Sequence, residues 1–114
     1  GEGLFAWGSG EANADRVPLI EAVGRALSEL SGSVLITGHT DDRPIRTLRF
    51  PSNWQLSQRR ADAVREILNR SVAPERLTAE GRADSAPLAA NDTPANRSLN
   101  RRVEISLLSA PTRE

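Results

Sequence analysis

Two short stretches of polar residues could together bind a charged ligand. Asp41 ends the run Gly38-His39-Thr40-Asp41, which follows an apolar, β-branched run. The carboxyl end of a parallel strand is where α/β sheets place their ligand sites. Asn53 and Arg60 are seven residues apart in a predicted helix and share one face. Such a carboxylate and guanidinium suit a zwitterion, since the first binds an ammonium group and the second a carboxylate. The structural alternative is an ion pair between Asp41 and Arg60 themselves.

The composition excludes several kinds of chemistry. The chain has no cysteine and a single histidine, His39, so no thiolate centre, multi-histidine metal site or cofactor is expected. No serine lies in a Gly-x-Ser-x-Gly motif. Asp41 and Asp42 are adjacent, and neighbouring strand residues point to opposite faces, so they cannot easily act as paired catalytic carboxylates. Fifteen basic residues balance fifteen acidic ones, which disfavours nucleic acid as a partner. We therefore expect a binding protein and not an enzyme.

The hydrophobic pattern predicts the elements that would position these residues. A single domain is predicted over residues 1–114, with a short strand over 4–7 as its first element. A helix follows, capped by Asn13 or Asp15, with Pro18 in its first turn and Gly32 after its end. Its apolar stripe consists of Leu19, Ile20, Val23, Leu27 and Leu30. A buried strand over 34–36 leads into the polar run that ends at Asp41.

The second half of the chain supplies one more long helix and two strands. The helix begins after Ser52, with Gln55 as its capping-box partner. Its core stripe consists of Ala61, Val64, Ile67 and Leu68. Residues 76–84 alternate as a third strand, and a cap at Thr93 starts a short helical turn. The last strand alternates at Val103, Ile105 and Leu107. This phase turns Arg101 inward and Arg102 toward solvent. The order β-α-β-α-β-β predicts an α+β, two-layer sandwich with one mixed four-stranded sheet and helices packed on one face.

Four motifs occur in order along nearly the whole chain. They are Gly38-His39-Thr40-Asp41, Ser52-Asn53-Trp54-x-Leu56-Ser57-x-x-Arg60-Ala61, Asn91-Asp92-Thr93-Pro94 and Asn100-Arg101-Arg102-Val103. Together they resemble the OmpA-like peptidoglycan-binding domain. The resemblance implies the β-α-β-α-β-β fold and non-covalent binding of peptidoglycan through the meso-diaminopimelate of its stem peptide. It also implies the ligand-binding residues, which are Asp41, Arg60, Asn53, Thr40 and Arg101.

The loop over 43–51 is longer than in porin-type relatives. The stretch over 46–54, together with the segment 80–85, resembles the OmpA-like extension of the DotU/TssL-type inner-membrane component of type VI secretion. The equivalent domain of a flagellar stator B subunit is the alternative. Either implies a periplasmic domain of a Gram-negative inner-membrane protein, with peptidoglycan and other subunits of the membrane complex as partners. No run of ~18 apolar residues occurs, so we expect a domain excised from a longer protein whose membrane anchor lies outside this sequence. A homodimer, and a protein–protein scaffold without wall binding, stay open.

Overall fold

The computed structural model describes residues 3–6, 8–44 and 50–108. In chain order its elements are η1 Ala14–Arg16, α1 Val17–Ser28, β1 Ser33–His39, α2 Asn53–Leu68, η2 Pro74–Arg76, β2 Leu77–Gly81, α3 Pro94–Asn100 and β3 Arg102–Leu108. The two long helices and the last three predicted strands are therefore confirmed. In these ranges, no helix combines the length and the apolar character that crossing a bilayer requires.

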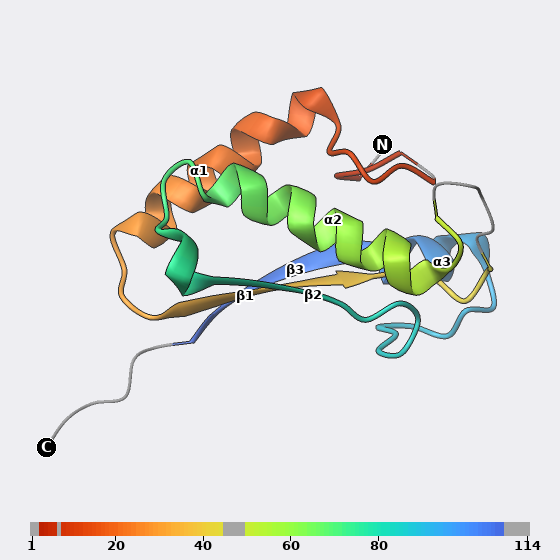
Figure 1. Ribbon diagram of the computed structural model, residues 1–114. Coiled ribbons are helices and arrows are strands. Elements are labelled where there is room, and N and C mark those ends of the chain that lie inside the picture. The colour runs from red at the N-terminus through yellow and green to blue at the C-terminus, as the bar shows by residue number, and fades with distance from the viewer. Residues whose placement is uncertain (1–2, 7, 45–49, 109–114) are drawn as a thin grey trace, which may run out of the picture.

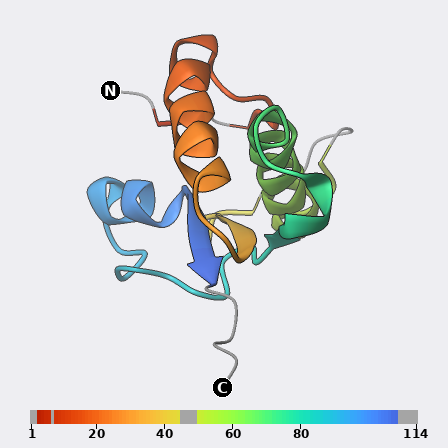
Figure 2. The same cartoon turned by 90° about the vertical axis from the view of Figure 1, so that its left-hand side faces the viewer.

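The sheet is mixed, with the strand order β2-β1-β3. β1 is parallel to β2, with Val34 opposite Leu77, and antiparallel to β3, with Ile36 opposite Ile105. α1 and α2 lie over the same face of the sheet, while α3 lies near the end where β1 stops (Figures 1 and 2). The long helices therefore form one layer and the sheet the other, as predicted, because the crossover through α2 makes β1 and β2 parallel.

The predicted first strand does not join this sheet. The described residues form three strands where the sequence predicts four. Phe5 makes only an isolated bridge with Ala12, and Trp7 of the predicted strand lies outside the described residues. Between the two bridge partners the chain reverses, and Gly8 has a φ of 75° that a residue without a Cβ adopts freely. Residues 3–6 and 8–12 therefore form a folded-back N-terminal arm instead of a sheet strand.

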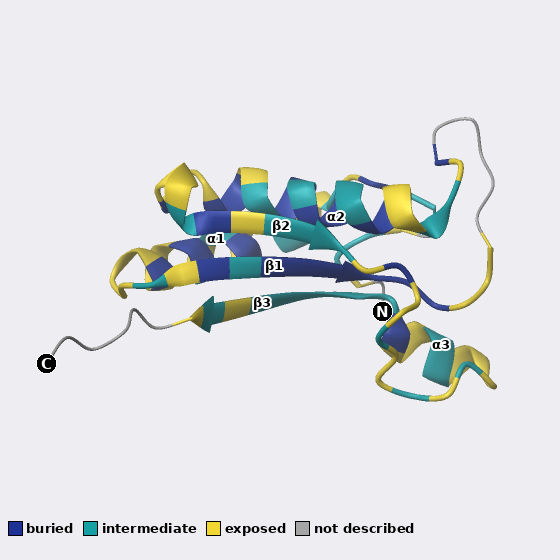
Figure 3. Ribbon diagram, turned by 60° about the horizontal axis from the view of Figure 1, so that its bottom comes forward, coloured by how far each residue is buried: buried dark blue, intermediate teal, exposed yellow. Residues whose placement is uncertain are grey.

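The core lies between the sheet and the two long helices. Val34 and Ile36 of β1 are fully buried and cluster with Ala61, Val64 and Leu68 of α2. Figure 3 shows the buried residues concentrated along β1, with exposed and buried residues alternating around α2. The predicted core stripe of the second helix is therefore confirmed.

The first helix packs along a different line from the one predicted. Ile20 and Leu27 are buried, but Leu19 and Leu30 are 57% and 52% exposed. Gly24 is also buried, and a Cβ at this position would lie 3.4 Å from a side chain of α2. The closest contact between the helices therefore follows the line from Ile20 through Gly24 to Leu27, which leaves the two exposed leucines to its sides.

α1 begins later than predicted, whereas α2 and α3 begin where predicted. The N-cap of α1 is Arg16, because the 3-10 turn η1 precedes the helix, and the predicted Asn13 is the N-cap of that turn instead. Ser52 is the N-cap of α2. Thr93 is the N-cap of α3, and its Oγ1 accepts a hydrogen bond from the backbone N–H three residues later at 3.0 Å. The start of α2 therefore lies beside the segment that follows β1, where Asn53 Nδ2 donates to Arg43 O at 2.9 Å. The carboxyl end of α3 leads directly into β3, whose first residue pairs with His39 at the end of β1.

The first turns of α2 lie directly against the sheet. A Cβ at Gly38 would overlap the backbone oxygen of Ser57, so only glycine fits there. Ser57 Oγ accepts a hydrogen bond from Ala83 N at 3.0 Å, and Gln58 Oε1 accepts one from Gly81 N at 2.9 Å. These contacts fix the amino-terminal half of α2 beside the residues that follow β1 and β2.

Candidate ligand-binding cleft

A cleft opens where β1 ends and α2 begins. It encloses about 290 Å³, including its open mouth. Its walls come from the N-terminal arm, the segment after β1, α2 and the residue before β3. The lining residues are Gly8, Thr40, Asp41, Arg43, Pro44, Asn53, Leu56, Arg60 and Arg101. The fold therefore brings together all five residues that the sequence predicts for the ligand site, although they are spread from Thr40 to Arg101 in the chain.

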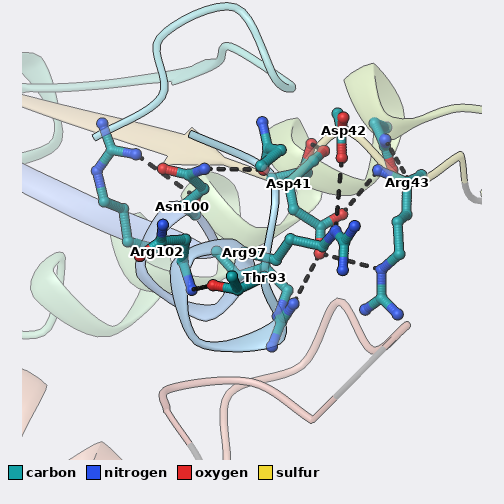
Figure 4. Close-up of polar contacts among 12 residues, drawn as sticks. Asp41, Asp42, Arg43, Thr93, Arg97, Asn100 and Arg102 are labelled. Carbon is teal, nitrogen blue, oxygen red and sulfur yellow. Dashed lines mark hydrogen bonds and ion pairs between the residues drawn. The ribbon is translucent and has the colours of Figure 1, made fainter. Parts of the chain in front are cut away.

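Asp41 is the acidic group of the cleft and is almost wholly buried. Its Oδ2 accepts a hydrogen bond from Arg101 Nη1 at 2.7 Å, and its Oδ1 accepts one from the backbone N–H of Arg43 at 2.9 Å. Arg43 Nε lies 3.4 Å from Oδ2, as Figure 4 shows. Among the described residues, Asp41 is ion-paired with Arg101 and Arg43. The alternative of a direct ion pair between Asp41 and Arg60 is wrong.

Arg60 reaches the cleft from α2 as a buried cation. Its Nε donates to Ser9 O at 2.9 Å and its Nη2 donates to Ala6 O at 3.2 Å. The guanidinium carbon lies 5.2 Å from the centroid of the Phe5 ring, within cation–π range. Burial and the positive charge of Arg101 lower the pKa of Arg60 to about 10. Arg60 is therefore charged at neutral pH, and it also holds the N-terminal arm, which the sequence did not predict.

Asn53 and Thr40 fix the backbone that follows β1. Asn53 Nδ2 donates to Arg43 O at 2.9 Å, and Thr40 Oγ1 donates to Asp41 O at 2.8 Å. The backbone N–H of Thr40 also donates to Ala83 O at 2.8 Å, which ties the end of β1 to the residues after β2. Both side chains therefore line the cleft and hold its acidic loop in shape.

Arg101 and Arg102 point in different directions, as the strand phase predicts. Arg101 turns toward Asp41 in the cleft. Arg102 Nε pairs with Glu104 Oε2 at 2.6 Å, and its Nη2 donates to Ala86 O at 2.9 Å. The prediction that Arg102 faces solvent is only partly right, because the loop before α3 covers its side chain.

Asn100 holds that loop against the start of β3. It is fully buried, and its Oδ1 accepts hydrogen bonds from Leu88 N at 2.7 Å and Ala89 N at 3.1 Å. Its Nδ2 donates to Ala89 O at 2.9 Å and to Asn91 Oδ1 at 2.8 Å (Figure 4). This side chain therefore fixes the backbone directly before Arg101.

Comparison with known proteins identifies the family. Residues 4–101 match the model of the OmpA family. This chain belongs to the OmpA family. The matched range includes every described wall of the cleft, from the N-terminal arm to Arg101.

The solved and curated relatives of this OmpA-family domain include a cell wall anchor, motility proteins and outer membrane porins. The solved structure of the cell wall anchor of the T6SS from Pseudomonas aeruginosa is 45% identical, with a TM-score of 0.88 over 94% of this chain and 76% of that one. The periplasmic domain of Helicobacter pylori MotB is 33% identical, with a TM-score of 0.79 over 85% of this chain and 64% of that one. Motility protein B of Bacillus subtilis is 35% identical over 108 residues, which are 92% of this chain and 41% of that protein. The chain thus spans less than half the length of this curated relative.

His39 of this OmpA-family domain lies outside the cleft lining. It is buried on β1, and its Nε2 lies 3.6 Å from Glu104 Oε1. Burial and the positive charge of Arg102 lower its pKa, so the imidazole is neutral at pH 7. In the part of the chain that the structure describes, no group of three or more His, Asp or Glu residues is placed to hold a metal ion.

Four lining residues were not among the ligand-site residues predicted from the sequence: Gly8, Arg43, Pro44 and Leu56. Arg43 follows Asp41 by two positions, the spacing at which an aspartate side chain accepts a hydrogen bond from a nearby backbone N–H in a turn. That spacing is a signal that could have placed Arg43 in the cleft. Gly8 reaches the cleft through the folded-back arm, for which the sequence pattern contains no comparable signal.

Proposed function

We propose that this OmpA-family domain is a non-enzymatic module that binds peptidoglycan in the periplasm and so anchors a membrane complex to the cell wall. The observation that carries the proposal is the cleft, in which a buried carboxylate and several guanidinium groups meet at the end of a parallel strand. The 45% identity with the cell wall anchor of the T6SS supports the anchoring role.

The proposed ligand group is the side chain of meso-diaminopimelate, which carries an ammonium and a carboxylate group. The ammonium group would bind Asp41 through Oδ1, which accepts one hydrogen bond within the domain and so has a second lone pair, whereas Oδ2 accepts from both Arg101 and Arg43. The carboxylate would bind the guanidinium groups of Arg60 and Arg101, which favour bidentate contacts with carboxylates. Thr40 and Asn53 would frame this pocket.

A secretion complex is the membrane assembly that we favour. Identity and TM-score are both higher for the T6SS anchor than for the MotB domain, which is the basis for this choice. A flagellar stator is the second candidate because MotB relatives also match over most of this chain. A homodimer is not needed to build the cleft, whose described walls all come from one chain.

Co-sedimentation of the domain with purified sacculi tests the proposal. We expect the domain to pellet with diaminopimelate-type sacculi in the absence of any other protein, and to leave the sacculi undegraded. Lysine-type sacculi should retain much less, because lysine lacks the side-chain carboxylate and would leave the arginine donors unpaired. Failure to pellet with either type would refute wall binding. Equal retention by both types of sacculi would refute the recognition of diaminopimelate, but it would not refute wall binding.

A further inference from the structure

The cleft carries more positive charge than a zwitterionic ligand can neutralise. Its described lining contains one carboxylate, Asp41, and three guanidinium groups, Arg43, Arg60 and Arg101. At the mouth, Asp42 Oδ1 lies 3.9 Å from Arg97 Nε, and this pair adds no net charge. The lining therefore has an excess of two positive charges.

This excess affects the groups inside the cleft. Burial and the charge of Arg101 together lower the pKa of Arg60, although Asp41 acts in the opposite direction. At Arg60, the repulsion from Arg101 thus outweighs the attraction from Asp41. A ligand group with one ammonium and one carboxylate would leave this excess unchanged. A second carboxylate on the ligand would reduce it.

Arg43 is the cation best placed to meet a second carboxylate. Its backbone is held on both sides, since its N–H donates to Asp41 Oδ1 and its C=O accepts a hydrogen bond from Asn53 Nδ2, each at 2.9 Å. Its side chain is 52% exposed and lies beside Asp41 at the mouth of the cleft (Figure 4).

The three arginines differ in how many of their N–H donors already make hydrogen bonds within the domain. Arg60 donates to two backbone carbonyls of the N-terminal arm, and Arg101 donates to Asp41 at 2.7 Å. Within the described parts of the chain, the Arg43 guanidinium group uses one of its five N–H donors, in a long contact from Nε to Asp41 at 3.4 Å. The backbone of Arg43 is fixed, and its guanidinium group is half-exposed with most of its donors available. Such a group is suited to binding an additional anionic group of a bound ligand.

We infer that Arg43 is a specificity-determining residue that binds a second carboxylate of the stem peptide, next to the diaminopimelate side chain. This inference rests on the proposed function. Two carboxylates of a stem peptide have this chemistry: the one at the carboxyl terminus of the peptide, and the free one of the glutamate that precedes diaminopimelate. The same guanidinium group would recognise either, so the experiment must separate them.

Binding of three synthetic tripeptides provides the test. Each contains alanine, γ-linked glutamate and meso-diaminopimelate; one has both carboxylates free, one has a carboxyl-terminal amide, and one has a glutamate amide. Their dissociation constants are measured by titration calorimetry for the wild-type domain, Arg43→Gln and Arg70→Gln. Arg70→Gln removes the same charge from an exposed residue that pairs with Glu21 after the far end of α2, away from the cleft. Circular dichroism checks that all three proteins are folded.

We expect one of the two amidations to weaken binding by about fivefold in the wild-type domain and in Arg70→Gln, as for a partly exposed charged contact. The amide that weakens binding identifies the carboxylate. Arg43→Gln should bind the free peptide about fivefold more weakly and should no longer distinguish it from that amide. Equal binding of all three peptides by the wild-type domain, or full discrimination by folded Arg43→Gln, would overturn the inference and leave the proposed function intact. If the wild-type domain bound none of the three peptides, both the inference and the proposed function would be overturned.

Discussion

Arg101→Ala is expected to weaken both the fold and the proposed ligand site. Arg101 Nη1 lies 2.7 Å from Asp41 Oδ2, and the Asp41 side chain is only 6% exposed. Removing one partner of a buried ion pair costs about 3–5 kcal/mol, because the remaining charge stays desolvated. Two features reduce this cost. The Arg101 side chain is 30% exposed, and Asp41 keeps its hydrogen bond from Arg43 N. We therefore expect the free energy of unfolding to fall by about 2 kcal/mol.

Arg102→Ala is the matched control for this substitution. It removes the same side chain one position later, where Arg102 pairs with Glu104 and holds Ala86 O but does not contact Asp41. The pair with the partly exposed Glu104 is worth at most about 1 kcal/mol. Urea denaturation gives the unfolding free energies of the three proteins, and co-sedimentation with sacculi gives their binding.

The two readouts should separate the variants. Arg101→Ala should lose most of its binding while remaining folded in the absence of urea. Arg102→Ala should bind like the wild-type domain. The opposite pattern, in which Arg102→Ala abolishes binding and Arg101→Ala preserves it, would refute the assignment of Arg101 to the cleft. An unchanged unfolding free energy for Arg101→Ala would refute the energetic role given to its ion pair with Asp41.

Gly38→Ala should lower the thermal unfolding midpoint, by the equivalent of roughly 1–3 kcal/mol, because the added Cβ would overlap Ser57 O. Gly24→Ala is the control and should change the midpoint little, because its Cβ would lie 3.4 Å from the nearest atom. Equal decreases of the midpoint in the two variants would contradict the close approach of α2 to Gly38. Asn100→Ala should cost about 2 kcal/mol in urea denaturation, because it removes a fully buried side chain that makes four hydrogen bonds to the loop before α3, and a wild-type midpoint would be the contrary result. Burial lowers the pKa of His39 below 6.5 in the folded state, so the unfolded chain binds the proton first as the pH falls. The free energy of unfolding of the wild-type domain should therefore decrease as the pH falls below about 6.5. His39→Gln should remove the part of this decrease that comes from His39. Identical dependence of the unfolding free energy on pH in the two proteins would contradict this prediction.

The sequence predicts an element correctly where the spacing of its apolar residues has a regular period over a long segment and where that whole apolar face is buried. The stripe through Ala61, Val64 and Leu68 has the helical period, and these residues are buried in α2. The apolar run over 4–7 has no such length, so its pattern does not determine whether it pairs in a sheet or folds back. Leu19 and Leu30 fit a helical stripe by spacing, but the contact of α1 with α2 is centred on a glycine, which a count of apolar residues does not include.

For the cleft, the sequence predicts which residues meet but not how they bond. Asp41 and Arg60 both line the cleft, yet Asp41 pairs with Arg101, sixty residues later in the chain. This pairing depends on β3 running antiparallel beside β1, a tertiary relation that the local spacing of charged residues does not encode. Arg43 belongs to an arginine-rich loop whose composition does not single it out, and only its spacing from Asp41 could have placed it in the cleft.

Arg60 belongs to two sets of contacts at once. It lines the cleft, and its Nε and Nη2 hold the backbone of the N-terminal arm. A displacement of the arm therefore changes the position of a charged group in the cleft, and by thermodynamic reciprocity a ligand that binds Arg60 changes how firmly the arm is held. Tension on the chain from the side of the arm would therefore act on the cleft through Arg60 and through Gly8 of the arm, which also lines the cleft.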